Sequence, residues 1–172
     1  MKVTIRKAQE KDIPVILDIT REAFSKYAFD LGQPDKVKAL KETEETIRAD
    51  MHRKVVLVGE LDGVPVGTIR YEQISPSTAY ISRFGVRLAA QSCGLGSALV
   101  NAVVTNCKEM GLSAVLLHTS AKMYSLIRFY YGKGFFISST STDRGYVRAL
   151  LVKELAPTGE IIDYAQQLSS AL

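Results

Sequence analysis

The sequence predicts an α/β fold, of the α+β kind, in which helices flank a mixed central sheet. Three observations support this prediction. Strand-like β-branched runs alternate with amphipathic helical patterns along the 172 residues. Asp62-Gly63 separates two apolar runs, which is a strong hairpin signal. Finally, the strand-like run ending at Val86 passes through a glycine-bearing loop into a helix of good helix formers that closes at Gly111.

The first third of the chain predicts one strand and two helices. Residues 2–9 alternate in polarity, and a helix opens at Glu10-Lys11-Asp12 with apolar residues at helical spacing as far as Tyr27. After a break at residues 31–34, a charge-rich second helix is expected from Lys36 to about Arg53. We interpret its charges as a solvated outer face. His52 is interpreted as ordinary surface.

The rest of the chain predicts six strands and two further helices before the tail. In order these are strands Val55–Glu60, Val66–Tyr71 and Ala79–Val86, the helix ending at Gly111, strand Ala114–Thr119, helix Met123–Gly132, and two strands around Asp143-Arg144-Gly145. Residues 1–157 are expected to form a single domain. Residues 158–172 are expected to form a short amphipathic helical tail, with apolar residues at Ile161, Ile162, Tyr164, Ala165 and Leu168.

Composition excludes several classes of protein. No apolar run is long enough for a membrane span and no leader pattern follows Met1, so a cytoplasmic protein is expected. Cys93 and Cys107 show neither zinc-site nor disulfide spacing, and no metal is expected. The formal charge of +4 comes without clustered basic residues and interleaved aromatics, which argues against nucleic acid as a partner. A mildly basic chain suits a polyanionic cofactor.

The loop from Gln91 to Ser97 is the strongest candidate binding feature. A strand leads through it into a helix N-terminus, where backbone N–H groups and the positive end of the helix dipole converge. This arrangement indicates a phosphate-binding loop. Leu99 stands where a nucleotide P-loop would begin its Gly-Lys-Ser/Thr run and where a dinucleotide fingerprint would carry its third glycine or alanine, so neither of those motifs fits.

Two motifs resemble one known family. Gln91, Gly94 and Gly96 match the Gln/Arg-x-x-Gly-x-Gly/Ala pyrophosphate loop of the GNAT superfamily of acyl-CoA-dependent N-acyltransferases. The segment from Phe129 to Phe135 resembles the family's Phe/Leu-Tyr-x-x-x-Gly-Phe segment, in the expected order. The chain is therefore identified as a member of this superfamily. The resemblance implies a sheet of about seven strands, splayed in a V between strands four and five and flanked by four helices.

The resemblance also implies a binding site for acetyl-CoA. The loop amides would bind the pyrophosphate, and the backbone of the fourth strand would pair with pantetheine. The residues concerned are Gln91, Ser92, Cys93, Gly94, Leu95, Gly96 and Ser97 in the loop, and Phe84, Gly85 and Val86 in the strand. Gly85 suits close approach of a ligand, although a plain strand with a glycine bulge is the alternative. Cys93 is either a reactive thiol or a tolerant position whose N–H contributes.

Tyr130 is the candidate proton donor for the leaving thiolate, because it lies four residues before Gly134, as in the family motif. Tyr131 should project about 100° further around the helix and is the less suitable donor. The alternative for Tyr130 is simple core packing.

The candidate base is His118, which ends the fifth predicted strand. Related proteins carry a base five residues before an Asn, and that Asn position corresponds here to Met123. A histidine near pKa 6.5 suits amine deprotonation. Glu72 is the rival, and a chain of water molecules is a third solution. The absence of Asn at Met123 leaves a usual cofactor contact in doubt.

The function implied by the resemblance is direct transfer of an acetyl group from acetyl-CoA to a primary amine. The alternative is a non-catalytic module that binds or senses acyl-CoA. The expected partner is a small-molecule or peptide amine, with neither nucleic acid nor membrane, and a homodimer is left open. Specificity is expected to depend on Tyr27 to Lys38, where Phe29, Asp30 and Asp35 offer apolar and anionic contacts.

Overall fold

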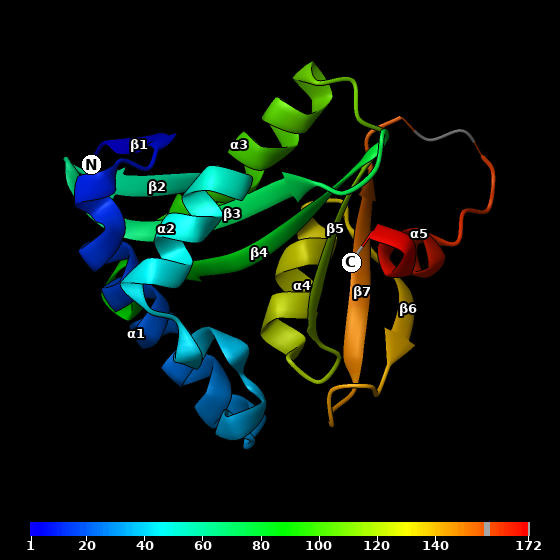
Figure 1. The fold of residues 1–172 in the computed structure, drawn as a ribbon, viewed down its shortest axis with the longest axis horizontal. Coiled ribbons are helices and arrows are strands. Elements are labelled where there is room, and N and C mark those ends of the chain that lie inside the picture. Colours follow the sequence, from blue (N-terminus) through cyan, green and yellow to red (C-terminus); the bar gives the residue numbers. More distant parts are fainter. Residues whose placement is uncertain (157–158, 172) are drawn as a thin grey trace. The chain divides into compact units, whose positions relative to one another are not determined.

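The computed structural model describes residues 1–156 and 159–171. In this part of the chain, a seven-stranded mixed sheet has the order β1-β2-β3-β4-β5-β7-β6, with β4 and β5 parallel (Figure 1). The strands are β1 (Val3–Lys7), β2 (Val55–Leu61), β3 (Val64–Gln73), β4 (Thr78–Val86), β5 (Ala114–Ser120), β6 (Phe136–Ser141) and β7 (Arg148–Glu154). The helices are α1 (Ile13–Leu31), α2 (Glu44–Arg53), α3 (Leu95–Glu109), α4 (Tyr124–Gly132) and α5 (Tyr164–Ala171).

The predicted mixed sheet is confirmed, including its splay. Hydrogen bonding between β4 and β5 covers three residue pairs, from Thr78–Ala114 to Tyr80–Leu116, and then stops. Four flanking helices were expected together with a helical tail, and the fifth helix is that tail.

The chain divides into two compact units. The first comprises Met1–Glu72 and Ser82–Val103, and the second comprises Gln73–Ile81 and the described residues from Val104 onward. The expected boundary between residues 157 and 158 lies outside the described residues, and the single-domain organisation stays a prediction.

In the first unit, the predicted hairpin forms at Asp62-Gly63. Leu61 pairs with Val64, which leaves these two residues as the loop, and both have positive φ (50° and 83°) as a type I′ turn requires. Helix α1 packs against α2 and β2 through a buried apolar cluster. Its members are Ile13, Ile16, Leu17, Ile47, Val56 and Val58.

The second helix begins later than the sequence predicts. Short 3-10 turns occupy Pro34–Lys36 and Lys38–Lys41, and α2 starts only at Glu44. Thr43 is its N-cap, since the Thr43 hydroxyl accepts a hydrogen bond from the Thr46 backbone N–H at 3.2 Å. The prediction of a helix from Lys36 is therefore wrong, because the capping threonine at position 43 makes Glu44 the first residue of α2.

The interpretation of the charged residues before and within α2 as a solvated face is wrong for two of them. Glu42 is 7% exposed and accepts a hydrogen bond from Arg70, which is fully buried on β3. Asp50 bonds the same Arg70 Nη1 atom at 2.9 Å, and Arg83 Nε bonds Glu42 at 2.9 Å. Burial alone would raise the pKa of both carboxyls, but the arginines hold each pKa below its ordinary value.

In the second unit, β5 pairs with β4 on one side and antiparallel with β7 on the other. The two faces of this part of the sheet carry different helices (Figure 1). Helix α5 packs through Tyr164 and Leu168 on the face that carries Leu116 and Leu150. Lys153, on the opposite face, reaches the carbonyl of Lys133 at the end of α4 at 2.6 Å. The predicted tail helix is confirmed, although Ile161 precedes it and is exposed.

We predict that Arg70→Ala destabilises the chain by about 3 kcal/mol, because it removes the fully buried cation that Glu42 and Asp50 share and leaves each carboxylate only its more exposed partners. Urea unfolding at pH 7 measures this change. Arg48→Ala is the matched control, because the Arg48 pair with Glu10 is exposed and its loss should alter the unfolding midpoint little. Equal midpoints for the two variants would contradict the structural role of Arg70.

Candidate functional site

The predicted phosphate loop connects β4 to α3 in the first unit. The first bond of α3 runs from the Ala98 N–H to the Gly94 carbonyl at 3.0 Å. Within the described residues, the backbone N–H groups from Ser92 to Ser97 donate to no protein acceptor. These N–H groups lie at the start of a 15-residue helix, so the loop has the donors and the dipole that a phosphate requires.

A different structural constraint explains each of the two glycines in the loop. Gly94 has φ of +87°, and a Cβ placed there would meet no atom within 4 Å, so its α-carbon faces open space beside the unpaired N–H groups. A Cβ at Gly96 would lie 3.3 Å from the ring of Phe84, so this glycine lets the helix begin close to β4. The residues present therefore fit a pyrophosphate group.

Neighbouring side chains fix the loop in place. Gln91 Nε2 donates to the Val86 carbonyl at 3.3 Å, and Cys93 Sγ donates to the Ala90 carbonyl at 2.6 Å. Leu95 is buried against the β2–β3 hairpin, where a Cβ at Gly67 would lie 2.9 Å from its Cδ2 atom. Leu95 thus anchors the start of α3 within the first unit.

The structure changes the explanation for Gly85. A Cβ at this position would lie 2.9 Å from the Cβ of Ala23, so packing of α1 explains the glycine without a ligand. The unusual backbone of β4 lies instead at Arg83, with φ of 50°. Sequence reasoning missed Arg83, since nothing in an arginine indicates a positive φ.

Tyr130 lies on α4 in the second unit and is 5% exposed. Its ring packs edge-on against Phe129 and Phe135, with centroid distances of 5.3 and 5.6 Å. Tyr131 is 50% exposed, and its hydroxyl accepts a hydrogen bond from the Ile137 N–H at 3.0 Å. The prediction that the two tyrosines project in different directions is confirmed. The burial of the Tyr130 ring is compatible both with a role as proton donor and with simple core packing.

His118 lies on β5 and forms a hydrogen bond of 2.7 Å between its Nδ1 atom and the Tyr80 hydroxyl. Burial lowers the pKa of His118 to about 4, with further lowering by Arg148 and Arg144 that Asp143 partly opposes. The expectation of a pKa near 6.5 is therefore wrong, and the ring is neutral at pH 7. When the phenol donates to Nδ1, the proton of the ring lies on Nε2.

His118 and Tyr130 approach the sheet from opposite faces. His118 is paired with Leu150, whose face packs against α5, and paired residues of adjacent strands share a face. Tyr130 belongs to α4, whose end contacts Lys153 on the other face. The second unit therefore supplies a phenol on one face of the sheet and an imidazole on the other.

The remaining candidates have defined environments. Glu72 lies 3.2 Å from Lys54 Nζ in an ion pair. Met123 is the N-cap of α4 and makes no side-chain capping bond. In the expected specificity region, Phe29 is 83% exposed, and Asp30 forms an ion pair with Lys26.

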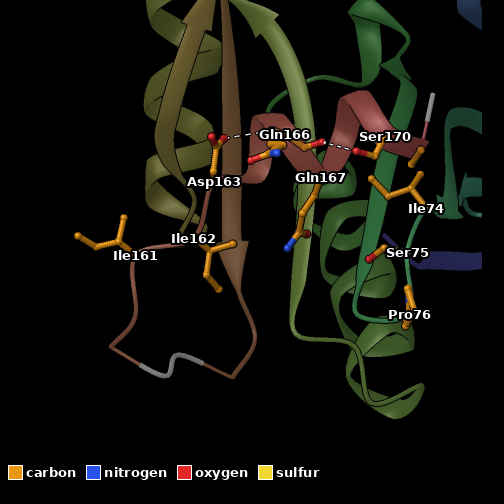
Figure 2. Close-up of a pocket in the computed structure, with 10 residues that line it drawn as sticks. Ile74, Ser75, Pro76, Ile161, Ile162, Asp163, Gln166, Gln167 and Ser170 are labelled. Atoms are coloured by element: carbon orange, nitrogen blue, oxygen red, sulfur yellow. Dashed lines mark hydrogen bonds between the residues drawn. The ribbon is translucent and has the colours of Figure 1, made fainter.

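An open groove lies along α5 (Figure 2). The β3–β4 connection supplies Ile74, Ser75 and Pro76 to its wall, and the tail supplies the remainder. Local hydrogen bonds from the Gln166 N–H to Asp163 and from the Ser170 hydroxyl to the Gln166 carbonyl stabilise the tail helix itself (Figure 2). None of the predicted site residues lines this groove.

The described residues contain neither a candidate membrane span nor a candidate metal-binding cluster. None of the helices there combines the length and the apolar composition that a membrane span requires. The same residues contain no cluster of three or more His, Cys, Asp and Glu side chains suited to a metal ion.

Comparisons with known proteins agree on one family. The family model described as "Acetyltransferase (GNAT) family" matches residues 16–135. No curated protein matches the sequence. Among solved structures, the PaiA N-acetyltransferase of Thermoplasma acidophilum in complex with coenzyme A is similar, with a TM-score of 0.80 and 17% identity over 90% of this chain and 99% of that one.

Two further structures share the fold. The ribosomal-protein-S18-alanine N-acetyltransferase of Escherichia coli has a TM-score of 0.73 and 18% identity, over 94% of this chain and 99% of that one. A GNAT family acetyltransferase from Elizabethkingia anophelis with acetyl-CoA bound has a TM-score of 0.69 and 15% identity, over 89% and 98%.

We predict that His118 titrates with a midpoint near pH 4, measured from its ring proton signals by NMR. His52→Asn removes the other histidine of the chain and leaves a single set of signals to follow. Since the unfolded chain binds this proton nearer the ordinary pKa of 6.5, the free energy of unfolding should fall as the pH drops from about 6.5 towards 4. A midpoint near 6.5 would contradict the burial of the ring.

Proposed function

Because the chain belongs to the acetyltransferase (GNAT) family, we propose that it transfers an acetyl group from acetyl-CoA to a primary amine by direct attack. The single observation that carries this proposal is the row of unpaired backbone N–H groups from Ser92 to Ser97, beside the open α-carbon of Gly94. This loop would hold the pyrophosphate of acetyl-CoA. Phe84, Gly85 and Val86 of β4, which follow the point where pairing with β5 ends, would hold its pantetheine arm.

Tyr130 is proposed as the proton donor. Acetyl-CoA supplies the acetyl group as a thioester, so that attack by the amine breaks a C–S bond and a thiolate leaves. The phenol of Tyr130 would give its proton to that sulfur. Its ring is clamped between two phenylalanines, and this packing restricts the direction in which the hydroxyl points.

His118 is proposed as the group that takes the proton of the attacking amine. The ring is neutral at pH 7, and in the tautomer whose Nδ1–H donates to the Tyr80 hydroxyl the Nε2 atom is the acceptor that would take the proton. A pKa of about 4 makes it a weak base. Glu72 is the less suitable base because it is paired with Lys54.

The acceptor is proposed to be a small-molecule or peptide amine, and the enzyme to act in the cytoplasm. The mildly basic composition, with a formal charge of +4, supports a polyanionic cosubstrate. A homodimer is compatible with this function, and none of the proposed roles requires a second chain.

We predict that Tyr130→Phe lowers kcat by ~10²–10⁴-fold while the affinity for acetyl-CoA stays near that of the wild type. Steady-state thiol release with the best available amine measures the change. Tyr131→Phe is the control, because the hydroxyl of this half-exposed residue accepts a hydrogen bond from the Ile137 N–H on β6 and should matter for stability rather than turnover. Turnover of Tyr130→Phe at the wild-type rate would remove the hydroxyl from the mechanism.

We also predict that Gly94→Val weakens acetyl-CoA binding at least ~10-fold in calorimetric titration, because the side chain covers the N–H groups. Gly111→Val is the matched control at the other end of α3. Gly111 also has positive φ (+76°) and open space, so the two variants carry similar backbone strain. If both variants bind acetyl-CoA equally, the loop is not the cofactor site.

A further inference from the structure

Three polar side chains share one face of the sheet in the second unit, and one of them, Tyr80, packs against the apolar cluster under α5. Tyr80 pairs with Leu116, and His118 lies two residues further along β5, so both point to the same face. His118 pairs with Leu150, and Arg148 lies two residues before Leu150 on β7. Tyr80, His118 and Arg148 therefore share the face on which Leu116 and Leu150 pack against α5.

Arg148 is a buried cation without a close counter-ion. Its side chain is 8% exposed, and among the described residues its guanidinium makes no hydrogen bond. The nearest carboxylate oxygen, Oδ1 of Asp143, lies 3.9 Å from Nη1. That same oxygen accepts a hydrogen bond of 2.9 Å from Ser141, and the Asp143 side chain is 68% exposed. Such a cation is costly to bury unless something else pairs with it.

The charges around Arg148 favour an anion. His118 is neutral at pH 7, and Arg144 adds a second positive charge in the connection between β6 and β7. Asp143 is the negative charge that acts on the His118 ring. The guanidinium nitrogens of Arg148 are not among the fully buried, unpaired atoms of the described residues. They therefore retain some contact with solvent, and a ligand can reach them. A planar guanidinium binds a carboxylate through two parallel N–H bonds.

We propose that Arg148 binds the carboxylate of the acceptor, and that the acceptor is an amine carrying a carboxylate close to its amino group, as a free amino acid does. This inference rests on the proposed function, because it places the acceptor amine beside His118. It deepens that function by naming the substrate class.

The spacing on the sheet selects this class. Diagonal neighbours on adjacent strands lie about 7–8 Å apart, so the groups recognised by His118 and Arg148 are separated by only a few bonds. A polyamine would bring a second positive charge to Arg148 and be repelled. The N-terminus of a peptide has its carboxylate replaced by an amide, which leaves the guanidinium unpaired.

The first test compares acceptors that differ only at the carboxylate. Each common amino acid, its carboxamide and its decarboxylated amine are assayed with acetyl-CoA by thiol release. Since charge-assisted bonds discriminate strongly, kcat/KM should be roughly 10- to 100-fold higher for the amino acid than for its carboxamide, mainly through KM. Equal values for acid and amide, or preference for the decarboxylated amine, would overturn the proposal.

The second test compares three variants. Arg148→Gln should remove the preference by raising KM for the amino acid, while kcat/KM for the carboxamide stays near the wild-type value. Asp143→Asn removes the competing carboxylate and should lower KM for the amino acid. Arg144→Gln is the exposed control and should alter KM by less than Arg148→Gln does. An unchanged preference for the amino acid over its carboxamide in Arg148→Gln would overturn the proposal. If the Gln variant does not fold, Arg148→Lys, which keeps the charge but not the planar pair of N–H donors, replaces it in the same comparison.

A third measurement separates this inference from the proposed function. N-acetylglycine, a carboxylate that needs no turnover to bind, is titrated into the wild type and the Arg148 variant while the ring signals of His118 are followed by NMR. Saturable shifts in the wild type alone would support the carboxylate site even if no amine were acetylated. The absence of shifts in the wild type would overturn it. Calorimetry with coenzyme A must give equal affinities for both proteins, because a loss in the variant would assign Arg148 to a cofactor phosphate instead.

Discussion

The early end of the ladder between β4 and β5 is the constraint on which the candidate site depends. Only three residue pairs join the two strands, ending at Tyr80 and Leu116. Beyond this point β4 has a positive φ at Arg83 and leads into the loop from Gln91 to Ser97, whereas β5 continues through His118 paired with β7. Parallel strands that remained paired would use these backbone groups for each other and leave none for a ligand.

The parts of the fold that depend on local chemistry could be predicted from the sequence. Asp62-Gly63 fixes a turn that needs positive φ at two successive residues, and Gly111 ends α3 in a left-handed conformation. The unpaired N–H groups of the loop are equally local, since they follow from the start of a helix. Hairpin, helix start and helix end therefore depend on neighbouring residues and not on long-range contacts.

The features that sequence reasoning missed depend on contacts between distant residues. Glu42 and Asp50 read as solvated charges, and only the register of β3 brings the buried Arg70 to them. The sequence does not indicate Arg148, because this residue shares a face with His118 only through the pairing of β5 with β7. The sequence does not indicate the low pKa of His118 either, since burial and distant arginines lower it.

If Arg148 and His118 have the proposed roles, their positions would link recognition of the acceptor to its deprotonation. Burial is the largest cause of the low pKa of His118, and the positive charges of Arg148 and Arg144 lower it further. A carboxylate bound at Arg148 would cancel part of this second contribution and make the imidazole a better base. An acceptor without a carboxylate would leave the ring as weakly basic as before. By linkage, the same coupling means that protonation of His118 would strengthen binding of the carboxylate, so the base would gain part of its proton affinity from the correct acceptor.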